Sequence, residues 1–498
     1  MSALSFINSL GNAFSSLNGI GGGINDTSTT STSSALNDLA SPFDFDLQSL
    51  TLVSPEKGGI DLTPYMVELN YFEDIFSDSI SGKIVISDSI GIIRNLAVDG
   101  TERLIIKFSD GQNSAVISHQ CRVFSITNRS FDIGNMFETY TINFCSEELL
   151  LSQKYRVCKS YAQETLSNII EDVLGGSFLN TKKIINIDDT YGSYDITLPS
   201  KKVFETINWL TSFAQVSGTN GADMLFFENS NGYNVKSLQK LYGGTPYKSS
   251  YTYDPKNLNT TDDDSFQNET FTILKMEVLN TLDTLKGTSV GSFASRLITF
   301  DPMLRKKYIN DFNYKNYVQS AKTMNPEDIT TIDDTGKTVE ASDYTDRFGN
   351  AIYDLSNNAQ QDGTDQTGTF GVGPLKLMIT NSNQQSQQVI QNNSQYVSND
   401  FFIEKTSTFR EAQISLLNYT RVKIIVPGNS DLYVGMLLNM DIYGMDASAF
   451  DSNSTNRSQD TYLSGIYLIT AIRHIINVNR YITVIELAKE SNRKTDSA

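Results

Sequence analysis

The sequence predicts a mainly β protein with α+β inserts, in which an α/β domain connects two antiparallel β-barrels. Three observations support this class: long runs of β-branched and aromatic residues, a hairpin pattern that occurs twice, and an intervening stretch whose apolar spacing is helical. β-branched and aromatic residues fit a pleated sheet, whereas apolar residues three and four positions apart share one face of a helix.

The clearest strands lie toward the C-terminal end of the chain. Residues 465–474 (GIYLITAIRH) and 481–487 (YITVIEL) flank a turn at Asn477-Val478-Asn479, and this pattern predicts a hairpin. The segments before it predict, in order, a strand at 422–426 that stops at Pro427, a corner at 431–435 and a strand at 437–442.

A similar hairpin sequence occurs earlier in the chain. Residues 123–129 (VFSITNR) read like 467–473 (YLITAIR), and 140–144 (YTINF) read like 482–486 (ITVIE). This repetition predicts two β units built on one plan. The alternative is that two unrelated amphipathic hairpins look alike.

Three segments near the C-terminal end carry a resemblance to a known family: VPGNSDLYVGMLLNMDIYG, YLSGIYLITAIRHII and YITVIELAKES. They resemble the closing barrel of baseplate hub proteins of contractile-tailed bacteriophages, of the T-even type. That family is also similar to the N-terminal part of type VI secretion spike proteins. SGKIVISDSIGIIRNLAVDGTERLIIKF and LPSKKVFETINWLTSFA resemble the family too, so the likeness covers roughly 45–320 and 395–490.

The resemblance implies a homotrimer in which two tail-tube-like barrels per subunit form a pseudo-sixfold ring. Such a ring adapts the sixfold tail tube to the threefold central spike and encloses a DNA channel. The implied partners are the central spike protein, the tail tube protein, and neighbouring wedge and tape-measure proteins. Phage DNA passes through without specific binding. The implied location is the tail baseplate of the virion, after assembly in the host cytoplasm.

The spacing of apolar and turn residues predicts the order of the units. They are a flexible N-terminal tail (1–42), the first barrel (43–158), the α/β connecting domain (159–270), the second barrel (271–320 and 396–490), a polar low-complexity excursion (321–395) and a C-terminal tail (491–498).

Within these units, local signals predict further elements. First-barrel strands are expected at 47–53, 66–71, 80–87, 104–108, 118–127 and 139–144, and second-barrel strands at 271–279 and 295–300. A helical turn is expected at 90–97. Helices are expected after a capping box from Ser160 to Gln163, with an end at Gly175-Gly176, from Ser200, and at 409–417. A strand at 224–227 leads to a type I′ turn at Asn231-Gly232.

The charge balance excludes one class of function. A net charge of −18 argues against a surface that grips phosphates, because affinity for nucleic acid comes mainly from Lys and Arg. An acidic wall suits a DNA conduit, since it repels a polyanion; acidity that only maintains solubility is the alternative. No apolar run approaches the length of a membrane span, so no membrane insertion is expected.

The residues that carry chemistry show no site pattern, so we expect no enzyme and no catalytic, cofactor-binding or metal site. His119 and His474 lie in strand patterns without a nucleophile signature, although distant residues can meet in space. Cys121, Cys145 and Cys158 sit in or beside apolar runs, which predicts buried free thiols. Trp209 is expected in the core, and Asp262-Asp263-Asp264 in a solvated loop.

Two other readings remain open at this stage. One is a tube–spike connector of a tailocin or secretion particle, which is the same part in another machine. The other is a glycan-binding tail adhesin, which would place exposed aromatic residues on loops rather than inside strand patterns.

Overall fold

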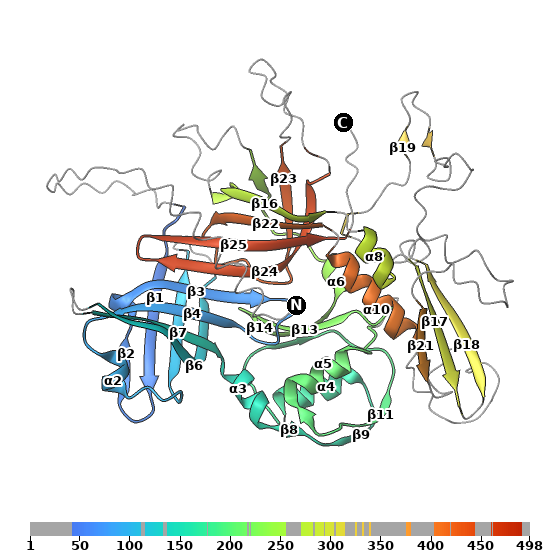
Figure 1. Cartoon of the computed structure of the whole chain (residues 1–498), viewed down its shortest axis with the longest axis horizontal. Coiled ribbons are helices and arrows are strands. Elements are labelled where there is room, and N and C mark those ends of the chain that lie inside the picture. The colour runs from blue at the N-terminus through green and yellow to red at the C-terminus, as the bar shows by residue number, and fades with distance from the viewer. Residues whose placement is uncertain are drawn as a thin grey trace, which may run out of the picture.

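The computed structural model describes residues 42–490 with gaps (Figure 1). The gaps are 111–114, 133–136, 177, 217–218, 220, 255–269, 282–283, 293, 303–304, 314–323, 326–330, 333–337, 340–374, 380–402, 419, 444–459 and 461. The predictions for nearly all of the N-terminal tail, the Asp262–Asp264 loop, most of 321–395 and the C-terminal tail therefore lie outside the described residues.

Six strands form the first part of the main sheet, in the spatial order β3–β4–β7–β6–β5–β1. Their bounds are β1 (Asp46–Ser54), β3 (Met66–Asp74), β4 (Ser81–Asp88), β5 (Arg103–Ser109), β6 (Ile117–Asp132) and β7 (Phe137–Ser146). β4 alternates between half-exposed and buried residues, as a strand with one face on a core does. The short β2 (Gly58–Asp61) lies outside β1, and η1 (Thr63–Tyr65) and α2 (Ile92–Leu96) complete this part.

Six more strands follow the same spatial plan, in the order β16–β22–β25–β24–β23–β15. Their bounds are β15 (Tyr251–Tyr253), β16 (Lys275–Thr281), β22 (Thr420–Pro427), β23 (Leu437–Ile442), β24 (Gly465–Asn477) and β25 (Arg480–Lys489). Each strand also holds the same rank along the chain as its counterpart. One difference is that β15 pairs with β23 in parallel, whereas β1 and β5 are antiparallel. This common order is what two units on one plan predict.

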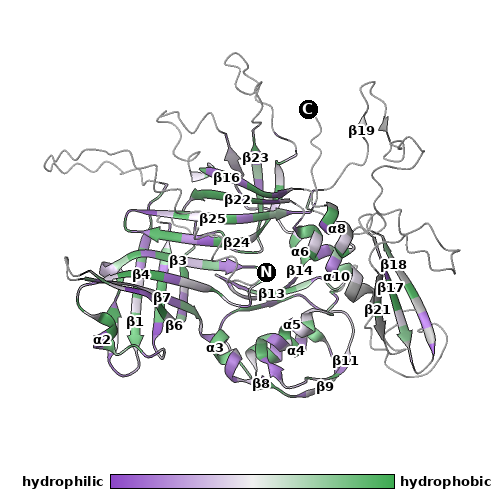
Figure 2. Ribbon diagram, in the orientation of Figure 1, coloured by the Kyte–Doolittle hydropathy of each residue, from purple (hydrophilic) through white to green (hydrophobic). Residues whose placement is uncertain are grey.

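The two sets of six strands form one continuous sheet, because β24 pairs with β3 (Figure 1). The mainly β class is therefore confirmed. Within the described residues, however, the ladders leave edges at β16 and β2 and do not close either set into a barrel. Each set has its own hydrophobic core, and the tip of the β24–β25 hairpin, at Ile476 and Tyr481, enters the core of the first set. Hydrophobic residues recur along these strands (Figure 2).

An α/β insert lies below the main sheet in Figure 1. Its elements are α3 (Glu147–Lys154), β8 (Arg156–Val157), β9 (Ser160–Glu164), α4 (Leu166–Gly175), β10 (Ile185–Ile187), β11 (Tyr194–Thr197), β12 (Lys201–Lys202), α5 (Val203–Thr211), β13 (Met224–Asn229), β14 (Gly232–Ser237) and α6 (Leu238–Tyr242). α4 and α5 bury one apolar face each in a third core, which they share with β13 and β14. Trp209 is half-buried there and meets the ring of Phe213 edge-on at 5.3 Å.

The capping box predicted from Ser160 to Gln163 is wrong. Those residues form strand β9, which pairs with β11, and Ser160 Oγ lies 3.0 Å from Thr197 Oγ1 across that ladder. The helix begins at Leu166 instead, because Thr165 Oγ1 accepts a hydrogen bond from the backbone N–H of Asn168. Its predicted end at Gly175 is confirmed.

Two other local predictions shift by a few residues. The helix expected from Ser200 begins at Val203, since Ser200 has a φ of +42°, outside the helical region. The hairpin turn expected at Asn231-Gly232 consists of Ser230 and Asn231, because Asn229 pairs with Gly232. Gly232 has a φ of +127°, so the glycine is still required at this bend.

A separate three-stranded sheet projects at the right of Figure 1. It contains β17 (Ala294–Asp301), β18 (Lys306–Asn313) and β21 (Leu375–Ile379), and α10 (Ile403–Leu417) and α8 (Thr284–Val290) stand between it and the main sheet. Residues 295–300 were expected in the second barrel; that is wrong, since β17 pairs only with β18 and β21 among the described strands. β21, with the short β19 (Thr331–Ile332) and β20 (Thr338–Val339), lies within the predicted polar excursion.

Candidate functional site

The residues with unusual chemistry gather around β3, where the two strand sets and the α/β insert meet. β3 pairs with β4 on one side and with β24 on the other, so its middle residues have no access to solvent. Asn70 and Tyr71 are fully buried, and Glu73 is 1% exposed. A buried polar group needs a hydrogen-bond partner: Asn70 and Glu73 have partners from other parts of the chain, and the Tyr71 hydroxyl donates to Glu73 on its own strand.

Arg473 of β24 binds the first set directly. Its Nε and NH2 atoms donate to Asn70 Oδ1 at 2.8 and 2.5 Å, and its NH2 lies 3.7 Å from Glu68 Oε1. The guanidinium also lies over the ring of Phe72, 5.5 Å from its centroid. Burial lowers the pKa of Arg473, and Glu68 opposes that shift. A planar donor fork holds its acceptors in one geometry, so this contact sets how β24 and β3 are aligned.

Glu73 connects β3 to the other two units. Its Oε2 accepts the backbone N–H of Val434, at the corner before β23, at 3.1 Å. Its Oε1 accepts the Tyr71 hydroxyl at 3.2 Å, and the backbone of Ser230, in the β13–β14 turn, also donates to its carboxyl group. Burial raises the pKa of Glu73 to about 8, so the protonated form predominates at neutral pH.

Glu228 of β13 is the second buried acid at the junction. Its Oε2 accepts the Ile80 N–H at 3.0 Å and the Ser146 hydroxyl at 2.6 Å, both from the first set. Its Oε1 accepts from Lys183 Nζ at 2.6 Å, and Lys183 also reaches Glu148 at 2.7 Å. Burial by itself lowers the pKa of Lys183, but the two glutamates outweigh that effect and leave the pKa raised. The insert is therefore attached to the first set by hydrogen bonds from Ile80 and Ser146 to a buried carboxyl group that Lys183 accompanies within the insert.

The two histidines come together at this junction, although 355 positions separate them in the sequence. The ring of Tyr71 lies 5.7 Å from that of His119 and 5.8 Å from that of His474. His474 Nδ1 lies 2.7 Å from the Tyr481 hydroxyl. Burial lowers the pKa of His119 to about 4 and that of His474 to about 3, so both rings are neutral. They pack among the aromatic side chains of Tyr71, Phe108 and Tyr481.

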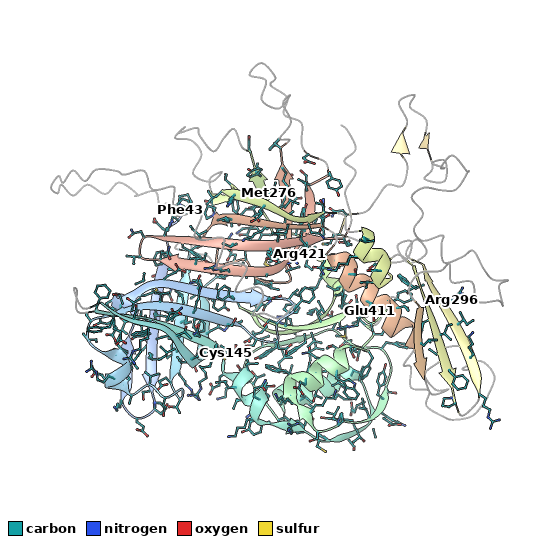
Figure 3. All side chains as sticks on the ribbon, viewed as in Figure 1. Phe43, Cys145, Met276, Arg296, Glu411 and Arg421 are labelled. Atoms are coloured by element: carbon teal, nitrogen blue, oxygen red, sulfur yellow. The ribbon has the colours of Figure 1, made fainter. Side chains whose placement is uncertain are left out.

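The cysteine prediction is correct for two residues and wrong for the third. Cys121 and Cys145 are buried free thiols, and Cys145 faces the insert (Figure 3). Cys158 is exposed, because the short strand β8 that ends at Val157 buries only that residue. Within the described residues, no three His, Cys, Asp or Glu side chains gather closely enough to hold a metal ion. None of the helices there has the length and apolar character needed to cross a bilayer.

Two of the strand edges that stay open in the main sheet, within the described residues, carry exposed apolar side chains. The β5–β6 ladder stops at Arg122, so from Phe124 onward β6 pairs only with β7. Phe124 is 54% exposed and Phe131 is 66% exposed. β16 pairs only with β22, and its Val278 is 40% exposed. Met276 marks this upper edge in Figure 3. Open apolar edges are sites where another strand can add.

The fold and the site define a mainly β protein with a repeated six-strand unit, a buried polar junction and open strand edges. No known protein-family model matches the chain. It is 22% identical over 429 residues to the probable baseplate hub protein gp334 of Vibrio phage KVP40, covering 83% of this chain and 87% of that protein. The resemblance of the sequence to baseplate hub proteins is thereby confirmed.

Solved structures of related shape were also found. The tail protein from Neisseria meningitidis MC58 superposes with a TM-score of 0.47 at 9% identity, covering 90% of this chain and 97% of that one. The E. coli c3393 protein, a component of the type VI secretion system, superposes with a TM-score of 0.39 at 10% identity, covering 91% and 79%.

Removal of the Lys183 ammonium tests the junction. We expect Lys183→Met to lower the free energy of unfolding by about 3–5 kcal/mol, because Glu228 would be left as an uncompensated buried acid. Lys202→Met is the matched control: Lys202 lies 3.8 Å from an exposed Glu205, and such a pair contributes about 1 kcal/mol or less. Denaturant unfolding of both variants measures the difference. Equal losses would contradict the ionic role of Lys183.

The pKa of Glu73 predicts a pH dependence of stability. Its folded pKa, about 8, lies above the ordinary value of 4.5, so the folded state holds the proton longer than the unfolded state. Stability from this group is therefore fully present below about pH 4.5 and is lost as pH rises to about 8. We expect Glu73→Gln to lose less stability than the wild type between pH 5 and pH 8, by an amount on the order of a few kcal/mol. Denaturant unfolding at both pH values checks this; parallel losses would refute it.

Proposed function

We propose that this protein is the structural hub of a contractile-tail baseplate, and that it acts as a homotrimer. Two strand sets in each of three subunits would form a ring of six similar units above and present threefold symmetry below. The ring would adapt the sixfold tail tube to the threefold central spike. The sequence likeness to a probable baseplate hub protein supports this assignment.

The observation that carries the proposal is a strand contact that the chain makes once, between β24 and β3, while the equivalent edges of β6 and β16 are unpaired among the described strands. The second half of β24 pairs with β3, and this contact is buried. By the repeated strand order, β6 is the counterpart of β24, and β16 is the counterpart of β3. On the side away from β7, the corresponding half of β6 has no ladder partner among the described strands. The side of β16 away from β22 has none either. If β6 of one subunit pairs with β16 of the next, every set meets its neighbours in the same way.

The repeat also gives the register of that contact. The return strands 140–144 and 482–486 match, and Arg473 pairs with Val484 while Ile126 pairs with Ile142, so Ile126 takes the place of Arg473, which pairs with Phe72. Counting across the ladders from the matched return strands places Val278 of β16 where Phe72 stands. In the first set, Phe72 pairs with Ser81, which pairs with Cys145 on its other side. In the second set, Val278 pairs with Val422, which pairs with Leu487. Ile126 of one subunit should therefore lie opposite Val278 of the next.

The remaining parts of the role follow from position and charge. A ring of this kind would have the central spike protein on one side and the tail tube protein on the other, with wedge and tape-measure proteins as further neighbours. With a net charge of −18, acidic side chains would line the channel and let DNA pass without holding it. The location would be the virion baseplate, after assembly in the host cytoplasm, and the role is structural.

Cysteine pairs test the trimer and its register together. In a Cys158→Ser background, we expect Ile126→Cys with Val278→Cys, or Thr127→Cys with Glu277→Cys, to form disulfides between subunits. Opposed residues of an antiparallel pair have Cα atoms about 4.5–5.5 Å apart, which is within disulfide reach. Oxidised protein should migrate as a trimer without reductant, and light scattering should give a trimer mass before oxidation.

The control places one cysteine on a strand away from the contact. Lys107→Cys with Val278→Cys should give no disulfide-linked trimer, since Lys107 is exposed on β5, away from the proposed contact. Class averages of negatively stained particles should show a pseudo-sixfold ring around a central hole. A stable dimer, a trimer without a hole, or equal cross-linking of the control pair would overturn the proposal.

A further inference from the structure

A cleft of about 540 Å³ lies between the α/β insert and the second strand set. On the insert side it is lined by Lys236 of β14 and Lys240 of α6, and Lys248 follows on the connection to β15. Tyr433 and Met436, from the corner before β23, line the other side. We call this recess the lysine cleft. It has not entered the argument for the hub.

The charges of the lysine cleft are only partly balanced. Asp188 is 9% exposed and lies 3.0 Å from the Lys236 ammonium and 3.7 Å from that of Lys240, while its other oxygen accepts the backbone N–H of Ser237. Lys248 lies 3.9 Å from Asp431. The two longer distances exceed hydrogen-bond range, and an ammonium has three donors to place. Three cations facing two carboxylates leave a positive recess in a chain whose net charge is −18.

The inward orientation of both carboxylates leaves the lysines available to a ligand. Asp431 accepts the Ala115 N–H at 2.8 Å and the Tyr247 hydroxyl at 3.3 Å, so each of its carboxylate oxygens already has a hydrogen-bond donor other than Lys248. The side chains of Lys236, Lys240 and Lys248 are 29%, 42% and 74% exposed. The ammonium groups therefore border the opening rather than the interior.

The walls of the cleft are fixed by contacts between the two units. The backbone N–H of Tyr247 donates to Leu437 O at 2.8 Å, which attaches the insert side to β23. Gly435 has a φ of +93°, and an added Cβ would lie 3.1 Å from the Phe227 ring, so the corner packs tightly onto β13. A recess whose walls are set before the ligand arrives loses little entropy on binding.

We propose that the lysine cleft binds an acidic peptide segment of a partner protein. Carboxylates of the segment would pair with Lys236, Lys240 and Lys248, and an apolar side chain would cover the floor formed by Met436 and Leu437. A small inorganic anion would satisfy the lysines but leave the apolar floor uncovered. Duplex DNA carries charge every 1.7 Å or so, and the net charge of −18 on the chain would repel it. The proposal does not rest on the hub assignment.

The test uses the full chain and a fluorescein-labelled eight-residue peptide of alternating Glu and Leu, followed by fluorescence anisotropy. We expect saturable binding that weakens with added salt. The triple variant Lys236→Gln, Lys240→Gln, Lys248→Gln should bind at least roughly tenfold more weakly, since three partly exposed ion pairs are lost. The matched control is Lys57→Gln, Lys107→Gln, Lys154→Gln, which removes the same charge from exposed lysines elsewhere and should bind as the wild type does.

Three further measurements distinguish the acidic peptide from an uncharged peptide, inorganic phosphate and duplex DNA as ligands of the lysine cleft. A peptide of alternating Gln and Leu should not bind, and neither millimolar inorganic phosphate nor a 12-base-pair DNA duplex should displace the acidic peptide. Absence of binding, equal loss in the control variant, or displacement by phosphate or duplex would overturn the proposal. Circular dichroism of both triple variants shows that they fold, and light scattering of the same samples reports separately on the trimer.

Discussion

The pairing of β24 with β3 is the contact on which the rest of the structure depends. It joins residues 471–477 to residues 68–74, and it turns two strand sets into one sheet. Because the joined strands lie in the middle of that sheet, Asn70, Glu73 and Arg473 are almost completely shielded from water. Their polar groups must then find partners inside the protein. That requirement explains why Arg473 binds Asn70, and why Glu73 reaches across to the corner before β23.

The α/β insert is held by the same kind of constraint. Glu228 reaches the first set through Ile80 and Ser146, and Lys183 opposes the rise in the pKa of Glu228 that burial causes. A buried ion pair adds little net stability, since the loss of hydration offsets the attraction. Its effect is on geometry: each charge tolerates only one arrangement of its partners. We interpret the junction as the device that holds three units at fixed angles, which a ring of repeated sets requires.

The repeat explains the distribution of exposed apolar residues on the main sheet. Within the chain, the β24-type and β3-type edges cover one another, and Tyr71 and His474 are fully buried there. Their counterparts on β6 and β16 expose Phe124, Phe131 and Val278. A sheet seldom leaves such an edge open. Among the described residues, the chain thus carries two edges of the β24 type and two of the β3 type, and it pairs one of each.

The sequence by itself determined the β class, the repeated hairpins, the turn after Asn477 and the end of α4, because each depends on residues close together in the chain. Tertiary structure alone decided that β24 joins β3, that β17 leaves the main sheet, and that both histidines meet at Tyr71. It also placed Lys183 beside Glu228 and drew three lysines into one cleft. Local spacing specifies what kind of element forms. It does not record which strand edges remain open, and the choice among those edges sets every long-range contact.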